Sequence, residues 1–135
     1  MTGMEALPLR LSPDMDLRRA LEAAVAARLS RAAFVISGIG SLRHARLRLA
    51  GVPEPDILDG DLEILTLAGT ISQDGSHLHM SVANAEGRVL GGHVAYGCTV
   101  RTTAELLALL LPEWSFTREL DPTTGFAELV MRPER

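Results

Sequence analysis

The chain has 135 residues, of which 47% are hydrophobic and 22% are charged, and this composition fits one globular domain spanning residues 1–135. The formal net charge is −4, so DNA binding through a broad basic surface is not expected. No apolar run is long enough to cross a bilayer, and the single cysteine, Cys98, excludes a disulfide framework or a multi-cysteine zinc site.

Local patterns predict the elements of the first half of the chain. Apolar runs and alternation indicate strands over residues 7–11, 32–37, 43–49 and 62–68. Leucines at helical spacing predict a helix between the first two strands, with Asp14 as its N-cap and an apolar stripe running to Leu29. Gly38 and Gly40 are expected to end the second strand.

The second half is predicted to contain further strands and a second helix. Strands are expected over residues 77–83, 88–95, 98–100, 114–119 and 128–131. Thr102 and Glu105 have the spacing of a capping box, and leucines follow, so a helix is expected from Thr102 to the break at Pro112. Because this order is not a repeating βαβ unit, the predicted class is α+β, a largely antiparallel sheet of about seven or eight strands with two helices.

All 13 basic residues are arginines, and they are unevenly distributed. Residues 1–50 hold eight arginines against four acids, whereas residues 51–135 hold five arginines against thirteen acids. A basic strand at Arg43, Arg46 and Arg48 is the one candidate nucleic-acid surface. The alternative interpretation is a solvated edge strand, on which charge prevents aggregation.

Three of the four histidines, His77, His79 and His93, fall within one predicted hairpin. Residues 77 and 79 point to the same face of a strand. If Asn84 pairs with Arg88 across the connecting loop, His93 lies opposite His79 and diagonal to His77. The three imidazoles would then converge on one point.

Three histidines and a water form an open tetrahedral site for a divalent transition metal, most naturally zinc. A small anion is an alternative ligand for the same cluster. Cross-strand polar pairs on a solvated face, or a hydrogen-bonded histidine cluster, would explain the residues without any ligand. A zinc-dependent hydrolase is a weaker hypothesis, for which Glu63 is the one catalytic candidate and a salt bridge or a partly exposed strand position its simpler explanation.

Several motifs resemble a known family, the plants and prokaryotes conserved domain (PPC). The segments that carry the resemblance are Gly60–Leu65, Leu67–Ile71, His77–Ala83, Gly87–His93 and Gly97–Glu105, with the tail Phe116–Leu129. The resemblance spans essentially the whole chain. It implies an α+β fold with an antiparallel sheet and a homotrimer.

In plants, the domain of this family follows AT-hook segments within nuclear DNA-binding proteins. There it mediates self-association and partner binding. The chain has no Arg-Gly-Arg-Pro hook, so that route into the minor groove is absent. With its three histidines it resembles stand-alone bacterial and archaeal members, which are described as DNA-binding only by analogy. DNA is therefore expected to bind weakly or through a partner.

Small residues indicate an interface between copies of the chain. Gly91, Gly92 and Gly97 would leave part of the sheet unusually bare, which favours burial against a neighbouring subunit. The resemblance to the PPC family implies that three copies of the chain assemble. The first eleven residues lack a basic stretch followed by an apolar one, so we expect no signal peptide, no membrane association and a cytoplasmic location.

Overall fold

The computed structural model describes residues 3–134, which form one helix and eight strands. In chain order the elements are β1 (Glu5–Leu11), α1 (Leu17–Ala27), β2 (Ala32–Arg48), β3 (Asp56–Ser72), β4 (Gly75–Ala83), β5 (Val89–Val94), β6 (Thr99–Leu110), β7 (Trp114–Asp121) and β8 (Phe126–Pro133). The largely antiparallel sheet is confirmed, and the predicted second helix is wrong. Among the described residues, no helix has the length and apolar composition needed to span a membrane.

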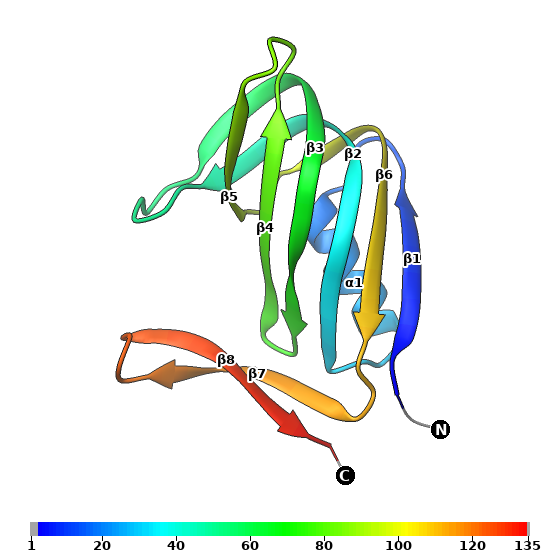
Figure 1. Cartoon of the computed structure of the whole chain (residues 1–135), viewed down its shortest axis with the longest axis vertical. Helices are drawn as coiled ribbons and strands as arrows, with labels where there is room; N and C mark the ends of the chain where they lie inside the picture. The colour runs from blue at the N-terminus through cyan, green and yellow to red at the C-terminus, as the bar shows by residue number, and fades with distance from the viewer. Residues whose placement is uncertain (1–2, 135) are drawn as a thin grey trace.

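Six strands form the main sheet in the order β1-β6-β2-β3-β4-β5 (Figure 1), and all neighbouring strands in this order are antiparallel. The end of β2 also pairs with β5, which curls that part of the sheet toward closure. Helix α1 covers one face, and Leu17, Leu21 and Val25 pack into the core from it. The hairpin β7–β8 forms a separate two-stranded sheet that crosses below the ends of the main strands.

The segment expected to form the second helix is the interior strand β6, second in the order of the main sheet. It lies between β1 and β2, so both of its edges form backbone hydrogen bonds. Ala104, Leu106, Ala108 and Leu110 alternate into the core, while the residues between them face outward. Pairing on both edges therefore outweighs the helical preference of a leucine-rich run.

The glycines expected to end a strand lie inside one long strand instead. A Cβ at Gly38 would stand 2.7 Å from Leu106 Cδ2, and a Cβ at Gly40 would stand 2.5 Å from the Thr103 carbonyl oxygen. These glycines let β2 approach β6 closely at its irregular register shifts. The helix also begins later than expected, because Asp16, not Asp14, accepts the capping hydrogen bond from the Arg19 amide.

Candidate metal centre

The loop of the β4–β5 hairpin is set by one asparagine. The Asn84 side chain accepts hydrogen bonds from the backbone amides of Glu86 and Arg88, and Gly87 adopts a positive φ of 79°. The Asn84 amide donates to the Arg88 carbonyl at 2.9 Å. This geometry places His79 directly opposite His93, so the predicted register is confirmed.

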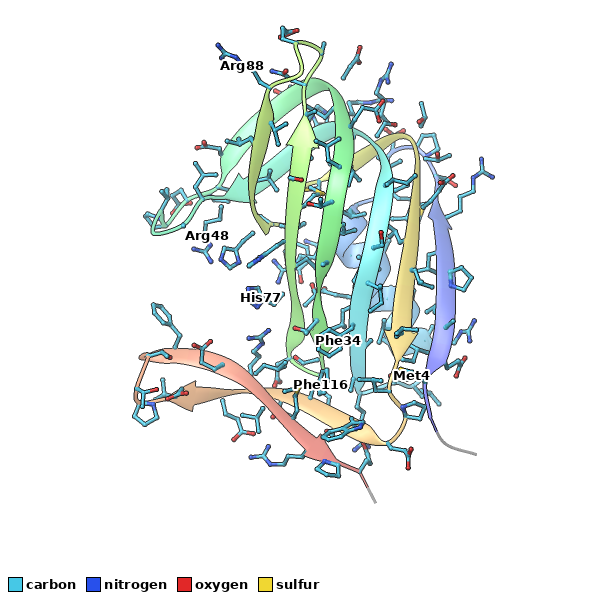
Figure 2. The ribbon with its side chains drawn as sticks, viewed as in Figure 1. Met4, Phe34, Arg48, His77, Arg88 and Phe116 are labelled. Carbon is cyan, nitrogen blue, oxygen red and sulfur yellow. The ribbon has the colours of Figure 1, made fainter. Side chains whose placement is uncertain are left out.

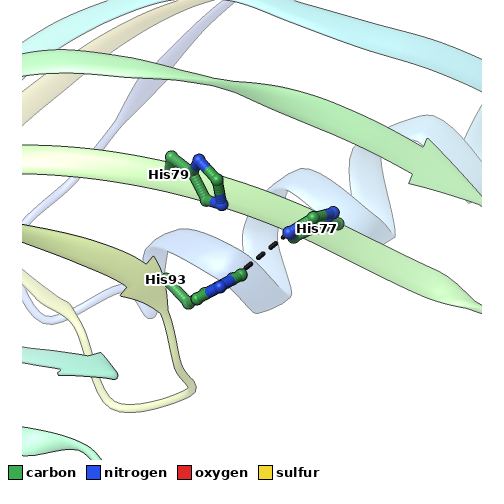
Figure 3. Close-up of side chains that lie close together, drawn as sticks. All are labelled: His77, His79 and His93. Atoms are coloured by element: carbon green, nitrogen blue, oxygen red, sulfur yellow. Dashed lines mark hydrogen bonds between the residues drawn. The ribbon is translucent and has the colours of Figure 1, made fainter. Parts of the chain in front are cut away.

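The three histidine side chains converge on one face of the hairpin (Figure 3). His77 Nε2 lies 3.2 Å from His93 Nδ1, and one ring nitrogen from each histidine lies within 4.8 Å of the others. The rings of His77 and His93 stack at 5.0 Å, and His79 meets both edge-on. None of the three is fully buried, so the cluster is open to a ligand from solvent.

The environment of His77 and His93 favours neutral imidazoles. Burial lowers the pKa of His77 below its ordinary value, and the charge of Arg118 lowers it further, while Glu128 acts in the opposite direction. Burial likewise lowers the pKa of His93, with the charge of Arg48 as the next cause. Neutral imidazole is the form that ligates a metal.

The residues present fit a metal ion held by nitrogen. Tetrahedral zinc with ligands at roughly 2.0–2.1 Å requires ligand nitrogens about 3.3–3.4 Å apart. The 3.2 Å separation between His77 Nε2 and His93 Nδ1 is close to this spacing, and the ring nitrogen of His79 lies within 4.8 Å of both. A set of three imidazoles suits zinc and its neighbours in the first transition row.

Arg18 of α1 holds the two histidine-bearing strands together beside the cluster. Its guanidinium donates to the carbonyls of Ser76 and Val94, which adjoin His77 and His93 in sequence. Glu22 accepts from the Arg18 side chain and from the Ser76 hydroxyl and amide, while Tyr96 lies under the Arg18 guanidinium. The helix thereby fixes where both histidines leave the sheet.

The cluster opens into a groove of about 890 Å³ between the main sheet and the β7–β8 hairpin. Figure 2 shows His77 and Arg48 directed toward this side of the molecule. Side chains from α1, the loop after β2, β4, β5, β7 and β8 contribute to the lining. Arg118 and Glu128 of the second hairpin lie in it, and nothing in the local sequence around them indicates this position.

Glu63, the catalytic candidate, is not brought to the histidines. It is exposed on β3 and pairs with Ser41 and Ala83. Ala68, which pairs with His79, is five residues further along β3, roughly 16 Å away at strand spacing. Glu128 is the glutamate that shares the groove with His77.

The three arginines of the basic strand do not act as one surface. Arg43 lies 3.6 Å from Asp14, and the side chain of Arg46 packs over Gly97. Arg48 lines the groove beside the histidines. The alternation expected for this strand is confirmed, because Ala45 and Leu47 are buried between the outward-facing side chains.

The three glycines proposed for an interface also have roles within one chain. A Cβ at Gly92 would lie 2.7 Å from the Arg48 carbonyl oxygen, and Gly91 lies close to the Met80 carbonyl. Gly97 has a positive φ of 108°, and its amide donates to Asp16. Their role between subunits stays a prediction.

The fold and the site define a class: a small, largely antiparallel β domain with one helix and a histidine cluster on its β4–β5 hairpin. The chain belongs to the family of the Plants and Prokaryotes Conserved (PCC) domain, whose model matches residues 1–112. This confirms the resemblance drawn from the sequence motifs. The β7–β8 hairpin follows the matched residues.

The relatives cover nearly the whole chain. A Synechococcus protein described as bifunctional protein GlmU is 44% identical over 131 residues, which are 97% of this chain and 21% of that protein. The chain thus spans about a fifth of this curated relative. A hypothetical protein from Salmonella enterica has a TM-score of 0.94 at 37% identity, covering 98% of this chain and 96% of that one.

Two further solved structures share the fold of this chain. A metal-containing protein from Archaeoglobus fulgidus has a TM-score of 0.80 at 27% identity, covering 96% and 95% of the two chains. A protein from Bacteroides thetaiotaomicron, assigned provisionally to DNA binding, has the same TM-score at 19% identity, covering 96% and 97%. At that identity the second likeness shows the fold alone.

Proposed function

We propose that this chain is a metal-binding domain in which His77, His79 and His93 hold one divalent transition metal, with zinc as the best fit. The observation that carries the proposal is the convergence of three ring nitrogens within 4.8 Å. The lowered pKa values of His77 and His93 support it, because these imidazoles stay neutral near pH 7. The Archaeoglobus relative, described as metal-containing, supports it as well.

The proposed role is binding rather than hydrolysis. When bound by three histidines, zinc supplies a Lewis acid with an open coordination position. A hydrolase also needs a positioned acid or base; Glu63 lies far from the cluster along β3, and Glu128, which lines the groove, has no hydrogen bond to the three histidines within residues 3–134. The chain's own residues hold the ion, orient its ligands through Arg18 and leave one side open to the groove.

Elemental analysis of the purified protein tests the metal site. Protein prepared without chelators or a metal-affinity tag is expected to carry close to one metal ion per chain. The double variant His79→Ala, His93→Ala is expected to lose it, while His44→Ala keeps it, because His44 pairs with Asp59 away from the cluster. Wild-type protein that is metal-free and takes up no zinc at micromolar concentration would overturn the proposal.

Self-association into a homotrimer is part of the same proposal. The face of the sheet opposite α1 exposes several large apolar side chains, among them Ile36 at 48%, Ile39 at 54% and Leu65 at 48%. Such a patch is costly to leave in water and favours contact with another copy. The family resemblance supports an assembly of three copies.

Light scattering coupled to size exclusion measures the assembly. The expected mass is three times 14.5 kDa at low micromolar protein. Ile39→Glu on the exposed face is expected to lower the mass, whereas Leu29→Glu, at an exposed apolar position just after α1, is expected to leave it unchanged. A wild-type monomer that still binds metal would contradict the trimer and leave the metal site intact.

DNA association through Arg43, Arg46 and Arg48 is the second candidate, and the basic segment of β2 is the observation behind it. The net charge of −4 per chain opposes it, and the three arginines are not gathered into one stripe. We expect at most weak, non-specific binding that disappears at physiological salt. Sequence-selective, nanomolar retention of duplex DNA at such salt would reverse this order of preference.

A further inference from the structure

Two arginines of the groove make no ion pair within residues 3–134. Arg48 and Arg118 are half-buried in its lining. The third arginine there, Arg18, is committed to Glu22 and to two backbone carbonyls. A half-buried guanidinium without an acidic partner is a ready donor for an anion.

Arg48 lies on one side of the histidine cluster. It is the cross-strand partner of His93 in the β2–β5 pairing, and His93 is in turn the partner of His79 in the β4–β5 pairing. Cross-strand partners point to the same face with Cβ atoms about 4.5–5.5 Å apart. Arg48, His93 and His79 therefore form one row across three strands.

Arg118 lies on the other side of the cluster. Thr70 is the cross-strand partner of His77 in the β3–β4 pairing, and the Arg118 guanidinium donates to the Thr70 hydroxyl at 3.3 Å. The Arg118 amide donates to Asp74 at 2.8 Å, which fixes this part of β7 against the main sheet. The two arginines thus flank the three imidazoles from opposite sides.

The rest of the lining provides an apolar surface and a moderate charge. Pro53, Pro55 and Phe126 stand in the groove, and Phe126 is 71% exposed. Asp74 and Glu128 partly offset the arginines. With a divalent metal on the histidines, a surplus of positive charge remains that one or two carboxylates would balance.

We propose that this groove binds a small organic acid, with its carboxylate between Arg48 and Arg118 and its apolar part against Phe126 and the two prolines. This inference rests on the proposed metal site, because His77 and His93 line the same groove. Arginine forms paired hydrogen bonds with carboxylate, and the apolar wall favours an organic anion over an inorganic one. The β7–β8 hairpin, which supplies Arg118 and Phe126, then sets which acids fit.

Cobalt-loaded protein tests the inference, because the visible absorption of Co²⁺ reports on its ligands. Benzoate is expected to change the spectrum saturably, whereas benzyl alcohol, a neutral molecule of similar shape, leaves it unchanged. Arg48→Gln and Arg118→Gln are each expected to weaken benzoate binding about tenfold. Arg88→Gln, at the exposed tip of the β4–β5 hairpin, is the matched control (Figure 2).

The outcomes separate the two proposals. A chain that takes up no cobalt overturns the metal site, and this inference falls with it. A chain with a normal cobalt spectrum and no response to benzoate overturns this inference alone. It is also overturned when both arginine variants bind benzoate like the wild type, or when inorganic phosphate binds more tightly than benzoate.

Discussion

The two hairpins of this protein, β4–β5 and β7–β8, differ in what holds them in place. The first belongs to the main sheet, and Leu78, Met80 and Val82 anchor β4 in the core. The second is a separate two-stranded sheet held by Phe116 and a few hydrogen bonds to Arg31, Gln73 and Asp74. The first hairpin therefore fixes the three histidines, whereas the docking of the second shapes the groove beside them.

The largest expected effect comes from undocking the second hairpin. Phe116 is 1% exposed and meets Phe34 edge-on, with ring centroids 5.8 Å apart. Phe116→Ala should lower the free energy of unfolding by roughly 3 kcal/mol, measured in urea. Zinc binding by the folded variant should persist, since the histidines lie on the other hairpin.

Phe126→Ala is the control for that variant. Phe126 is 71% exposed in the same hairpin, so its removal should change stability by less than about 0.5 kcal/mol. Loss of zinc binding in folded Phe116→Ala would contradict the independence of the two hairpins.

A shift in the register of the β4–β5 hairpin should abolish the proposed metal site and leave the β7–β8 hairpin folded. One alanine inserted between Glu86 and Gly87 lengthens the loop that places His93 opposite His79. Zinc affinity should fall more than about a hundredfold, because His93 would then leave the shared face. Zinc titration measures this change, and an unchanged affinity would mean that the loop absorbs the extra residue.

A smaller effect is expected at the residue that ties α1 to the first hairpin. Arg18→Met removes the donors to the carbonyls of Ser76 and Val94 and should weaken zinc binding about tenfold. Arg19→Met is matched to it, because Arg19 also packs on Tyr96 but is exposed and makes none of these contacts. Equal affinities in both variants would remove the positioning role of Arg18.

The smallest expected effect is a change in the histidine pKa values when a nearby arginine charge is removed. In metal-free protein, Arg118→Gln should raise the pKa of His77 and leave that of His93 unchanged, while Arg48→Gln does the reverse. The pKa values of His77 and His93 in the folded protein lie below 6.5, the value in the unfolded chain. The stability that the two neutral imidazoles contribute is therefore fully present above pH 6.5 and is lost as the pH falls through the pKa values of the folded protein. Histidine NMR titration measures each group, and equal shifts at both would contradict the assignment.

The sequence by itself determined the histidine site, because its parts are local. Asn84 and Gly87 define a short loop, and alternation then assigns His77 and His79 to one face and His93 to a position opposite. The first helix and β1 are also confirmed, since a single apolar stripe and a short alternating run leave little choice.

Only the tertiary structure decided the rest. The leucine run after Thr102 has a helical pattern, yet it forms β6 because strands on both sides satisfy its backbone hydrogen bonds. Arg48 and Arg118 reach the histidines through the β2–β5 pairing and the docking of β7, contacts between residues 45 or more positions apart or across separate sheets. The spacing of neighbouring residues does not predict such contacts, because they form only when distant elements pack against one another.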